Sequence, residues 1–206
     1  ITIHLREDRR HIQDRDLNLL KETVHTRLNL EMAATEEMTL IALNAKPDMV
    51  TLVPEKREEV TTEGGLDVIK HKNKLKAIIE RFSEVNIPVS LFVDPVKEQL
   101  EICAEIKAGW IELHTGKYAV TKNNERAMEL SILKESTAKA KSLGLRVNAG
   151  HGLTYQNVEQ IAAIEGIEEL NIGHTIISRA LAVGLSQAVK EMKYLIINPR
   201  EGNSFL

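Results

Sequence analysis

The chain has 206 residues, of which 43% are hydrophobic and 28% are charged, a composition typical of a folded globular domain. The formal net charge of −3, with lysines and arginines mostly scattered among acids, argues against a nucleic-acid partner. No apolar run approaches the roughly 20 residues of a membrane-spanning helix, and the single cysteine, Cys103, excludes an intrachain disulfide framework. We therefore expect one domain over residues 1–206, with neither nucleic acid nor a membrane as its partner.

Short apolar runs alternate along the chain with longer segments of helical periodicity, which is the pattern of successive strand–helix units. In chain order, strands are predicted at Ile1–Leu5, Leu28–Met32, Met49–Val53, Val89–Val93, Trp110–His114, Arg146–Ala149 and Glu169–Ile172. Helices are predicted at Asp14–Thr26, Thr35–Asn44, Lys72–Val85, Val96–Ala108, Asn124–Leu143, Tyr155–Ile164 and Ile176–Ile197. The pattern predicts an α/β fold with a parallel sheet, either a closed barrel or a doubly wound open sheet.

The count of strand–helix units favours a barrel. Seven units are visible, one short of the eight in a TIM (β/α)8 barrel, and the chain opens directly in an apolar strand without an initiator Met. We expect a TIM barrel whose first βα unit is absent from the given sequence, with about 30 further residues upstream of Ile1. The longest connection, Pro54–Leu66, is polar and contains a Gly64–Gly65 pair, and connections of this length are often binding loops.

Polar residues gather where the predicted strands end, which in a TIM barrel is the rim that carries the active site. These residues are His4, Glu31, Glu112, His114, His151 and His174. Any one of these residues alone could equally be a hydrogen-bonded structural residue or a catalytic one. Because they come from five different strands and converge on one rim, together they predict an active site.

Two of the carboxylates allow different interpretations. Glu31 is surrounded in the sequence by apolar residues, and desolvation there would raise its pKa toward neutrality, as suits a general acid or base. The alternative is a buried carboxylate paired with an arginine. Glu112 and His114 alternate so that both point to one side of their strand, which fits packing inside the barrel as well as contact with a substrate.

Glycine-containing turns follow the last two predicted strands, at Asn148–Leu153 and Asn171–His174. Backbone amides at such turns form anion sites, and barrels commonly hold phosphate there, although glycine also permits a tight bend. A second anion site is predicted at Arg6–His11, where Arg9 and Arg10 are equally consistent with a solvated basic loop. No lysine lies at a strand end, which argues against Schiff-base chemistry, and no Walker or Rossmann glycine motif is present.

Longer motifs resemble a known family, the pyridoxine 5′-phosphate synthases, over essentially the whole chain. The motifs are His4–His11, Asn29–Ala33, Val53–Arg57, Glu59–Asp67, Glu112–Gly116, Val147–Tyr155 and Leu170–His174. The resemblance implies a cytoplasmic homo-oligomeric barrel, an octamer, without metal or organic cofactor. It implies condensation of 3-amino-2-oxopropyl phosphate with 1-deoxy-D-xylulose 5-phosphate to pyridoxine 5′-phosphate, phosphate and water.

The resemblance also implies roles for individual residues. His4 and Glu31 would accept protons, His151 would donate one, and Glu112 would support the transition state. The residues implied to hold deoxyxylulose phosphate are Arg6, His11 and Thr61, and those implied to hold the aminoketone phosphate are Gly152, Gly173 and His174. The family's opening strand supplies an Asn, an Asp-His pair and an Arg that touch substrates, and we expect the chain as written to lack that part of the site.

Two other functions remain open at the sequence level. A metal-dependent barrel hydrolase or a sugar-phosphate epimerase would also place His and carboxylate groups at strand ends, as ligands of Zn²⁺ or Mn²⁺. The usual paired-His ligand signature does not occur in the sequence. A barrel that serves only as a binding or assembly module would not be expected to gather titratable groups on one rim.

Overall fold

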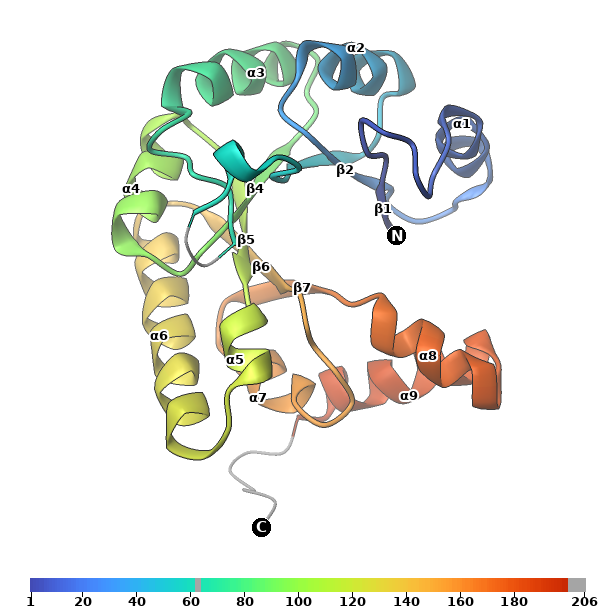
Figure 1. Ribbon diagram of the computed structural model, residues 1–206, viewed down its shortest axis with the longest axis vertical. Helices are drawn as coiled ribbons and strands as arrows, with labels where there is room; N and C mark the ends of the chain where they lie inside the picture. Colours follow the sequence, from blue (N-terminus) through green and yellow to red (C-terminus); the bar gives the residue numbers. More distant parts are fainter. Residues whose placement is uncertain (62–63, 200–206) are drawn as a thin grey trace.

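A computed structural model describes residues 1–61 and 64–199 and shows a curved parallel sheet with helices on its outer side (Figure 1). Seven strands follow one another in the sheet in their order along the chain. Their bounds are β1 Thr2–His4, β2 Asn29–Met32, β3 Met49–Leu52, β4 Val89–Val93, β5 Trp110–His114, β6 Arg146–Gly150 and β7 Ile167–Asn171. This arrangement confirms the predicted TIM-barrel-like fold, with β1 and β7 as the two edges of the described sheet.

The helices connect the strands and extend beyond β7. They are α1 Asp14–Thr23, α2 Glu36–Ala45, the 3₁₀ helix η1 Arg57–Glu59, α3 Lys72–Glu84, α4 Lys97–Glu105, α5 Gly116–Val120, α6 Asn123–Ser142, α7 Val158–Ala162, α8 His174–Val183 and α9 Leu185–Ile197. Local signals explain some of the boundaries: the Thr35 hydroxyl accepts the backbone N–H of Met38 at the start of α2. None of the described helices is long and apolar enough to cross a membrane.

The predicted strands agree with the structure, whereas the prediction of a single last helix was wrong. The segment Ile176–Ile197 is interrupted at Gly184, whose φ of 81° and ψ of 153° lie in a region that glycine alone adopts readily. The chain turns there, so that α8 and α9 pack against each other as a hairpin (Figure 1). The short helix α5 was not predicted, and the helix predicted at Tyr155–Ile164 is confined to Val158–Ala162.

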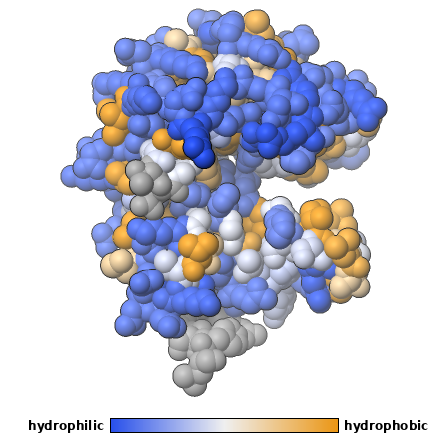
Figure 2. Space-filling model, in the orientation of Figure 1, coloured by the Kyte–Doolittle hydropathy of each residue, from blue (hydrophilic) through white to orange (hydrophobic). Residues whose placement is uncertain are grey.

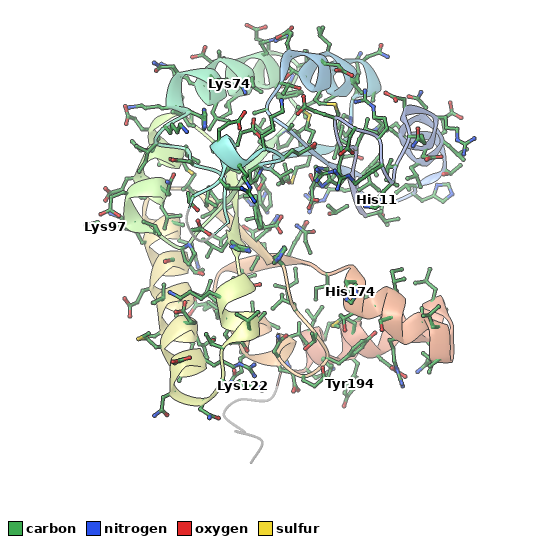
Figure 3. The ribbon with its side chains drawn as sticks, viewed as in Figure 1. His11, Lys74, Lys97, Lys122, His174 and Tyr194 are labelled. Carbon is green, nitrogen blue, oxygen red and sulfur yellow. The ribbon has the colours of Figure 1, made fainter. Side chains whose placement is uncertain are left out.

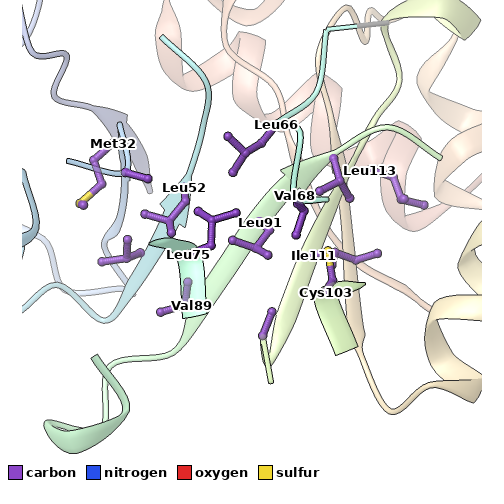
Figure 4. Close-up of a cluster of buried hydrophobic side chains, with 14 of the residues drawn as sticks. Met32, Leu52, Leu66, Val68, Leu75, Val89, Leu91, Cys103, Ile111 and Leu113 are labelled. Carbon is purple, nitrogen blue, oxygen red and sulfur yellow. The ribbon is translucent and has the colours of Figure 1, made fainter. Parts of the chain in front are cut away.

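The apolar core lies between the sheet and the helices that cover its outer side. Outward-facing strand residues such as Leu52, Leu91 and Ile111 are fully buried. They belong to the same cluster as Leu75 of α3 and Cys103 of α4 (Figure 4). Because strand residues alternate between faces, the neighbours of these residues point to the inside of the curved sheet.

The inner face of the sheet is polar and joined by hydrogen bonds. Thr51 donates to Asn29 over 3.0 Å, and the Asn29 amide donates to Thr2 over 3.4 Å. Thr2 in turn donates to Asn171 over 2.9 Å, and the Asn171 amide donates to Glu112 over 2.6 Å. This chain of hydrogen bonds, from Thr51 to Glu112, crosses from β1 to β7 and ends on a residue of the predicted active site.

Candidate active site

A pocket of about 1490 Å³ opens on the inner side of the sheet at the carboxyl ends of the strands and continues into the space between β1 and β7. Its lining includes seven of the ten predicted site residues: His4, Glu31, Glu112, His151, Gly152, Gly173 and His174. The lining does not include Arg6, His11 or Thr61, although all three are described. Figure 3 shows His11 and His174 on opposite sides of the opening.

Two carboxyl groups inside the pocket have pKa values raised into the neutral range. Burial raises the pKa of Glu31 to about 7, the direction expected from its apolar neighbours. Burial, and after it the charge of Glu31, raise the pKa of Glu112 to about 8. The hydrogen bond from Asn171 lowers this pKa but does not offset the other two effects. Gly150 leaves room for this arrangement, since a Cβ there would lie 2.1 Å from Glu112 Oε1. Near neutral pH the pair can both take up and release protons.

His4 lies between two carboxylates. Its Nε2 is 2.9 Å from Glu55 Oε1, and its Nδ1 is 3.8 Å from Glu31 Oε2. Glu55 is only 3% exposed, and its second oxygen accepts the backbone N–H of Glu7 over 3.0 Å. When Nε2 of His4 carries the hydrogen and donates it to Glu55, the lone pair of Nδ1 is directed toward Glu31.

His151 is held by the end of β5. The Thr115 hydroxyl lies 2.7 Å from the carbonyl oxygens of both Gly150 and His151. The ring of His114 meets that of His151 edge to face, with centroids 4.8 Å apart. His151 has a φ of 81°, which is uncommon for a residue with a side chain. Burial and then the charge of His114 lower the pKa of His151.

The turn after β7 leads directly into α8. Gly173 is the N-cap of this ten-residue helix, and a Cβ added to Gly173 would meet no atom within 4 Å. The exposed His174 is the first helical residue and lines the pocket. A helix N-terminus with an open approach at its first backbone N–H groups can hold a phosphate.

The Arg6–His11 segment contains arginines in different environments. Arg9 pairs with Asp14 at 3.1 Å and with Glu37 at 2.7 Å, so Arg9 anchors the loop to two helices. Arg10 forms a surface pair with Asp8 at 2.6 Å. Arg6 lies 3.9 Å from Glu55 and 3.5 Å from Asp8, and its Nε is buried without a hydrogen-bond partner. Arg6 therefore meets its carboxylate partners over longer distances than Arg9 and Arg10 do.

Three residues of the site region were given no role in the sequence-based prediction. They are Glu55, which binds His4, Asp94, which binds Thr61 and His114, and Asn171, which binds Glu112. Asp94 follows β4 directly and Asn171 ends β7, so the rule applied to the other strand ends would have found both. Glu55 lies in the β3–α3 connection, and no sequence pattern indicates its contact with His4 of β1.

Within residues 1–61 and 64–199, no group of three or more His, Cys, Asp or Glu side chains is arranged to hold a metal ion.

Comparison with known proteins gives close relatives over the whole chain. The family model described as pyridoxal phosphate biosynthesis protein PdxJ matches residues 1–198. A pyridoxine 5′-phosphate synthase from Prochlorococcus marinus (strain NATL1A) is 86% identical over 206 residues, which are 100% of this chain and 84% of that protein. Another, from Synechococcus sp. (strain WH7803), is 66% identical over 205 residues, covering 100% of this chain and 83% of that protein.

Solved structures support the same architecture at much lower sequence similarity. The crystal structure of KGPDC from Streptococcus mutans superposes with a TM-score of 0.65, covering 96% of this chain and 85% of that chain, at 12% sequence identity. At this identity the likeness concerns the fold alone.

Proposed function

Because the chain belongs to the PdxJ family of pyridoxal phosphate biosynthesis proteins, we propose that it acts as a pyridoxine 5′-phosphate synthase in the pocket at the carboxyl ends of its strands. Its substrates are 3-amino-2-oxopropyl phosphate and 1-deoxy-D-xylulose 5-phosphate. The observation that carries the proposal is the pair of carboxyl groups, Glu31 and Glu112, whose pKa values of about 7 and about 8 place both near their titration points at neutral pH.

The reaction needs several proton transfers. An amine joins a ketone with loss of water, phosphate is expelled, and a carbon–carbon bond closes the ring with loss of further water, so that one phosphate and two waters are released in all. In each step a proton is taken from or given to a reacting atom. His4, through Nδ1, and Glu31 accept protons, and His151 donates one. Glu112, with a pKa of about 8, is largely protonated at neutral pH, so it supports the transition state as a hydrogen-bond donor.

Two phosphorylated substrates require two anion sites. The aminoketone phosphate binds at the start of α8, where Gly152, Gly173 and His174 line the pocket. Deoxyxylulose phosphate binds on the side of Arg6, His11 and Thr61. For Arg6 the support is that its guanidinium has only long contacts, 3.5 Å to Asp8 and 3.9 Å to Glu55, and a guanidinium can meet phosphate oxygens with parallel hydrogen bonds.

The proposal is tested by incubating the purified chain with both substrates and measuring pyridoxine 5′-phosphate and inorganic phosphate. Glu31→Gln should lower turnover by ~10²–10⁴-fold, since the amide keeps the shape of the side chain but cannot exchange the proton. Glu36→Gln is the matched control, because Glu36 lies on the surface of α2 and pairs with Arg81. Absence of product from the wild type would overturn the function, and near-normal turnover of Glu31→Gln would return Glu31 to a structural role.

We also propose a homo-oligomer. No residue of α8 is buried, and large apolar side chains are exposed along the α8–α9 hairpin: Ile177, Leu181, Leu185, Tyr194 and Ile197. Figure 2 shows hydrophobic surface gathered at the end of this hairpin, and a second copy of the chain would remove it from water. Light scattering behind size exclusion should give a multiple of the 23.1 kDa chain mass, the octamer being expected from the family, and a monomer would contradict this.

A cytoplasmic location is the remaining part of the proposal. It agrees with a biosynthetic role and with the single, buried cysteine. Cell fractionation with an antibody against the chain would test it.

A further inference from the structure

Asp94 holds together two parts of the proposed active site that are distant in the sequence. It is the first residue after β4, and its side chain is 1% exposed. Its Oδ1 lies 3.1 Å from His114 Nδ1, and its Oδ2 accepts the hydroxyl of Thr61. The backbone N–H of Gly65 donates to both oxygens, at 3.1 and 3.2 Å. One carboxylate therefore contacts both the β3–α3 connection and the end of β5.

On one side, Asp94 fixes the connection that carries Thr61. Gly65 approaches so closely that a Cβ there would lie 2.5 Å from the backbone N of Asp94, and only glycine allows this approach. The backbone N–H of Gly64 donates to the Thr61 hydroxyl over 3.3 Å. Thr61 thereby holds a defined place although it lies outside the regular elements.

On the other side, Asp94 orients His114, whose ring lies against His151. The two imidazoles share the space above Gly116, where a Cβ would lie 2.6 Å from His114 Nε2 and 3.2 Å from His151 Cδ2. Phe92 completes the contact, with its ring centroid 5.0 Å from that of His114. A rotation of His114 would therefore displace the ring of His151.

The hydrogen bond to Asp94 also determines where the proton of His114 resides. Hydrogen bonds from His114, Thr61 and Gly65 outweigh the effect of burial and hold the pKa of Asp94 below its ordinary value, so Asp94 is a carboxylate near neutral pH. A carboxylate only accepts, so Nδ1 of His114 must carry a hydrogen and donate it. In the neutral ring, Nε2 then keeps its lone pair on the side of His151.

We propose that Asp94 is a positioning residue of the synthase reaction, which places Thr61 for deoxyxylulose phosphate and, through His114, the ring of the proton donor His151. This inference rests on the proposed function. A purely structural role would affect folding alone. The positioning role instead gives the Asp94 carboxylate two effects that can be measured separately. The effect through His114 concerns turnover, and the effect through Thr61 concerns binding.

The test uses Asp94→Asn, because the amide has nearly the shape of the carboxylate and its oxygen can still accept from Gly65. The new NH₂ group faces Nδ1 and forces it to accept, so the proton of His114 moves to Nε2. Glu129→Gln is the matched control: Glu129 is a buried carboxylate that lines the same small cavity as Asp94 and His114, and it pairs with Lys117 at 3.1 Å. Thermal unfolding shows whether each variant is folded.

Asp94→Asn should lower kcat by ~10–100-fold, the cost typical of removing the group that orients a functional histidine. Its amide oxygen still accepts from Thr61, so Asp94→Ala, which removes both contacts, is the variant that should also raise KM for deoxyxylulose phosphate. Glu129→Gln should leave both constants within about twofold of the wild type, as expected for a change away from the reacting groups. In a double-mutant cycle, Asp94→Ala added to His114→Gln should lower kcat no further but should still raise KM. Long-range ¹H–¹⁵N NMR should show the wild-type His114 protonated at Nδ1 and the variant ring at Nε2.

Three outcomes would each overturn the role of Asp94. They are additive effects on kcat in the double-mutant cycle, a His114 tautomer that is the same in the wild type and in Asp94→Asn, and kinetic constants of Asp94→Asn equal to those of Glu129→Gln. The NMR readout needs no turnover. A wild-type protein that forms no pyridoxine 5′-phosphate would therefore contradict the proposed function, while the tautomer of His114 would still decide whether Asp94 orients that ring.

Discussion

At the scale of single residues, the site depends on carboxylates that have different tasks. Glu31 and Glu112 are carboxyls whose pKa values are raised into the neutral range, whereas Glu55 and Asp94 are buried carboxylates that each hold a histidine. The first pair can exchange protons with a substrate. The second pair determines which ring nitrogen of a histidine is free to do so.

The raised carboxyl pKa values make stability depend on pH. An unfolded glutamate titrates near ~4.3, so between that pH and about 8 the folded protein keeps protons that the unfolded chain releases. The stabilisation that these bound protons give the folded protein is complete below pH ~4.3. It is lost as the pH rises through the folded-state pKa values of about 7 for Glu31 and about 8 for Glu112. Glu112→Gln should therefore stabilise the protein more at pH ~9 than at pH ~5, by on the order of a few kcal/mol.

Urea unfolding of the wild type and Glu112→Gln at the two pH values checks this, since groups that do not interact with Glu112 cancel in the comparison. The measured difference includes the interaction between Glu112 and Glu31. The neutral amide still offers an oxygen to the Asn171 amide, so the hydrogen bond is kept. An equal difference in unfolding free energy at both pH values would mean that Glu112 is ionised in the folded protein throughout this range.

Glu55 gives a second prediction at this scale. In Glu55→Gln, the side-chain NH₂ can face His4 Nε2 and force it to accept, so that Nδ1 carries the proton and no longer acts as the base toward Glu31. We expect turnover to fall by ~10–100-fold with the fold retained. Steady-state kinetics measures this, with Glu58→Gln, a neighbouring exposed residue, as the control. Unchanged turnover in Glu55→Gln would show that the tautomer of His4 does not matter.

Residues at strand ends were the part of the site most accessible from the sequence. The strand pattern placed His4, Glu31, Glu112 and His151 at one rim because parallel strands end on the same side of a sheet. The contacts of Glu55 and Asp94 depend on how the β3–α3 connection folds back over the strand ends. No periodicity encodes that path, so the contacts of Glu55 and Asp94 emerged only from the three-dimensional arrangement, although the place of Asp94 directly after β4 could have marked it as a site residue.

At the scale of elements, the strands were predictable because buried parallel strands are continuous apolar or β-branched runs. The α8–α9 hairpin was not, since Ile176–Ile197 has the apolar content of one long helix and Gly184 alone marks the turn. Isolated glycines occur inside helices at moderate cost. The backbone conformation of Gly184 ends α8 and begins α9. It depends on the packing of the two helices and cannot be deduced from the local sequence.

Gly184→Ala should destabilise the protein by ~1–3 kcal/mol, the cost of placing a Cβ on a backbone conformation of this kind. A Cβ at Gly184 meets no atom within 4 Å, so crowding would not contribute. Gly109→Ala is the matched control, because its Cβ also meets nothing within 4 Å but its φ lies outside the left-handed region. Equal melting temperatures for the two variants would show that the turn tolerates a side chain.

At the scale of the whole molecule, the chain forms one curved sheet that places the ends of seven strands around one pocket. We propose that residues 1–206 are a single domain, for which thermal unfolding should show one transition. The polar inner face also belongs to this scale. Thr2, Asn29, Thr51 and Asn171 come from four strands, and their hydrogen bonds together lead to Glu112. The architecture as a whole therefore supports one side chain of the proposed active site.

The order of the strands has a consequence for how the protein folds. Each strand pairs with the next one along the chain, so pairing can propagate from unit to unit, and early steps close only short loops. The hydrogen bond from Thr2 to Asn171 joins residues 169 positions apart and should form after the rate-limiting step. Thr2→Val removes this bond together with the longer one from Asn29. At a cost of about 1 kcal/mol for the bond to Asn171, it should speed unfolding about fivefold and slow refolding less than Thr51→Val does. Thr51→Val, which removes a bond between the neighbouring strands β2 and β3, should also slow refolding, and stopped-flow chevrons of both variants would reveal whether the two ends of the sheet meet last.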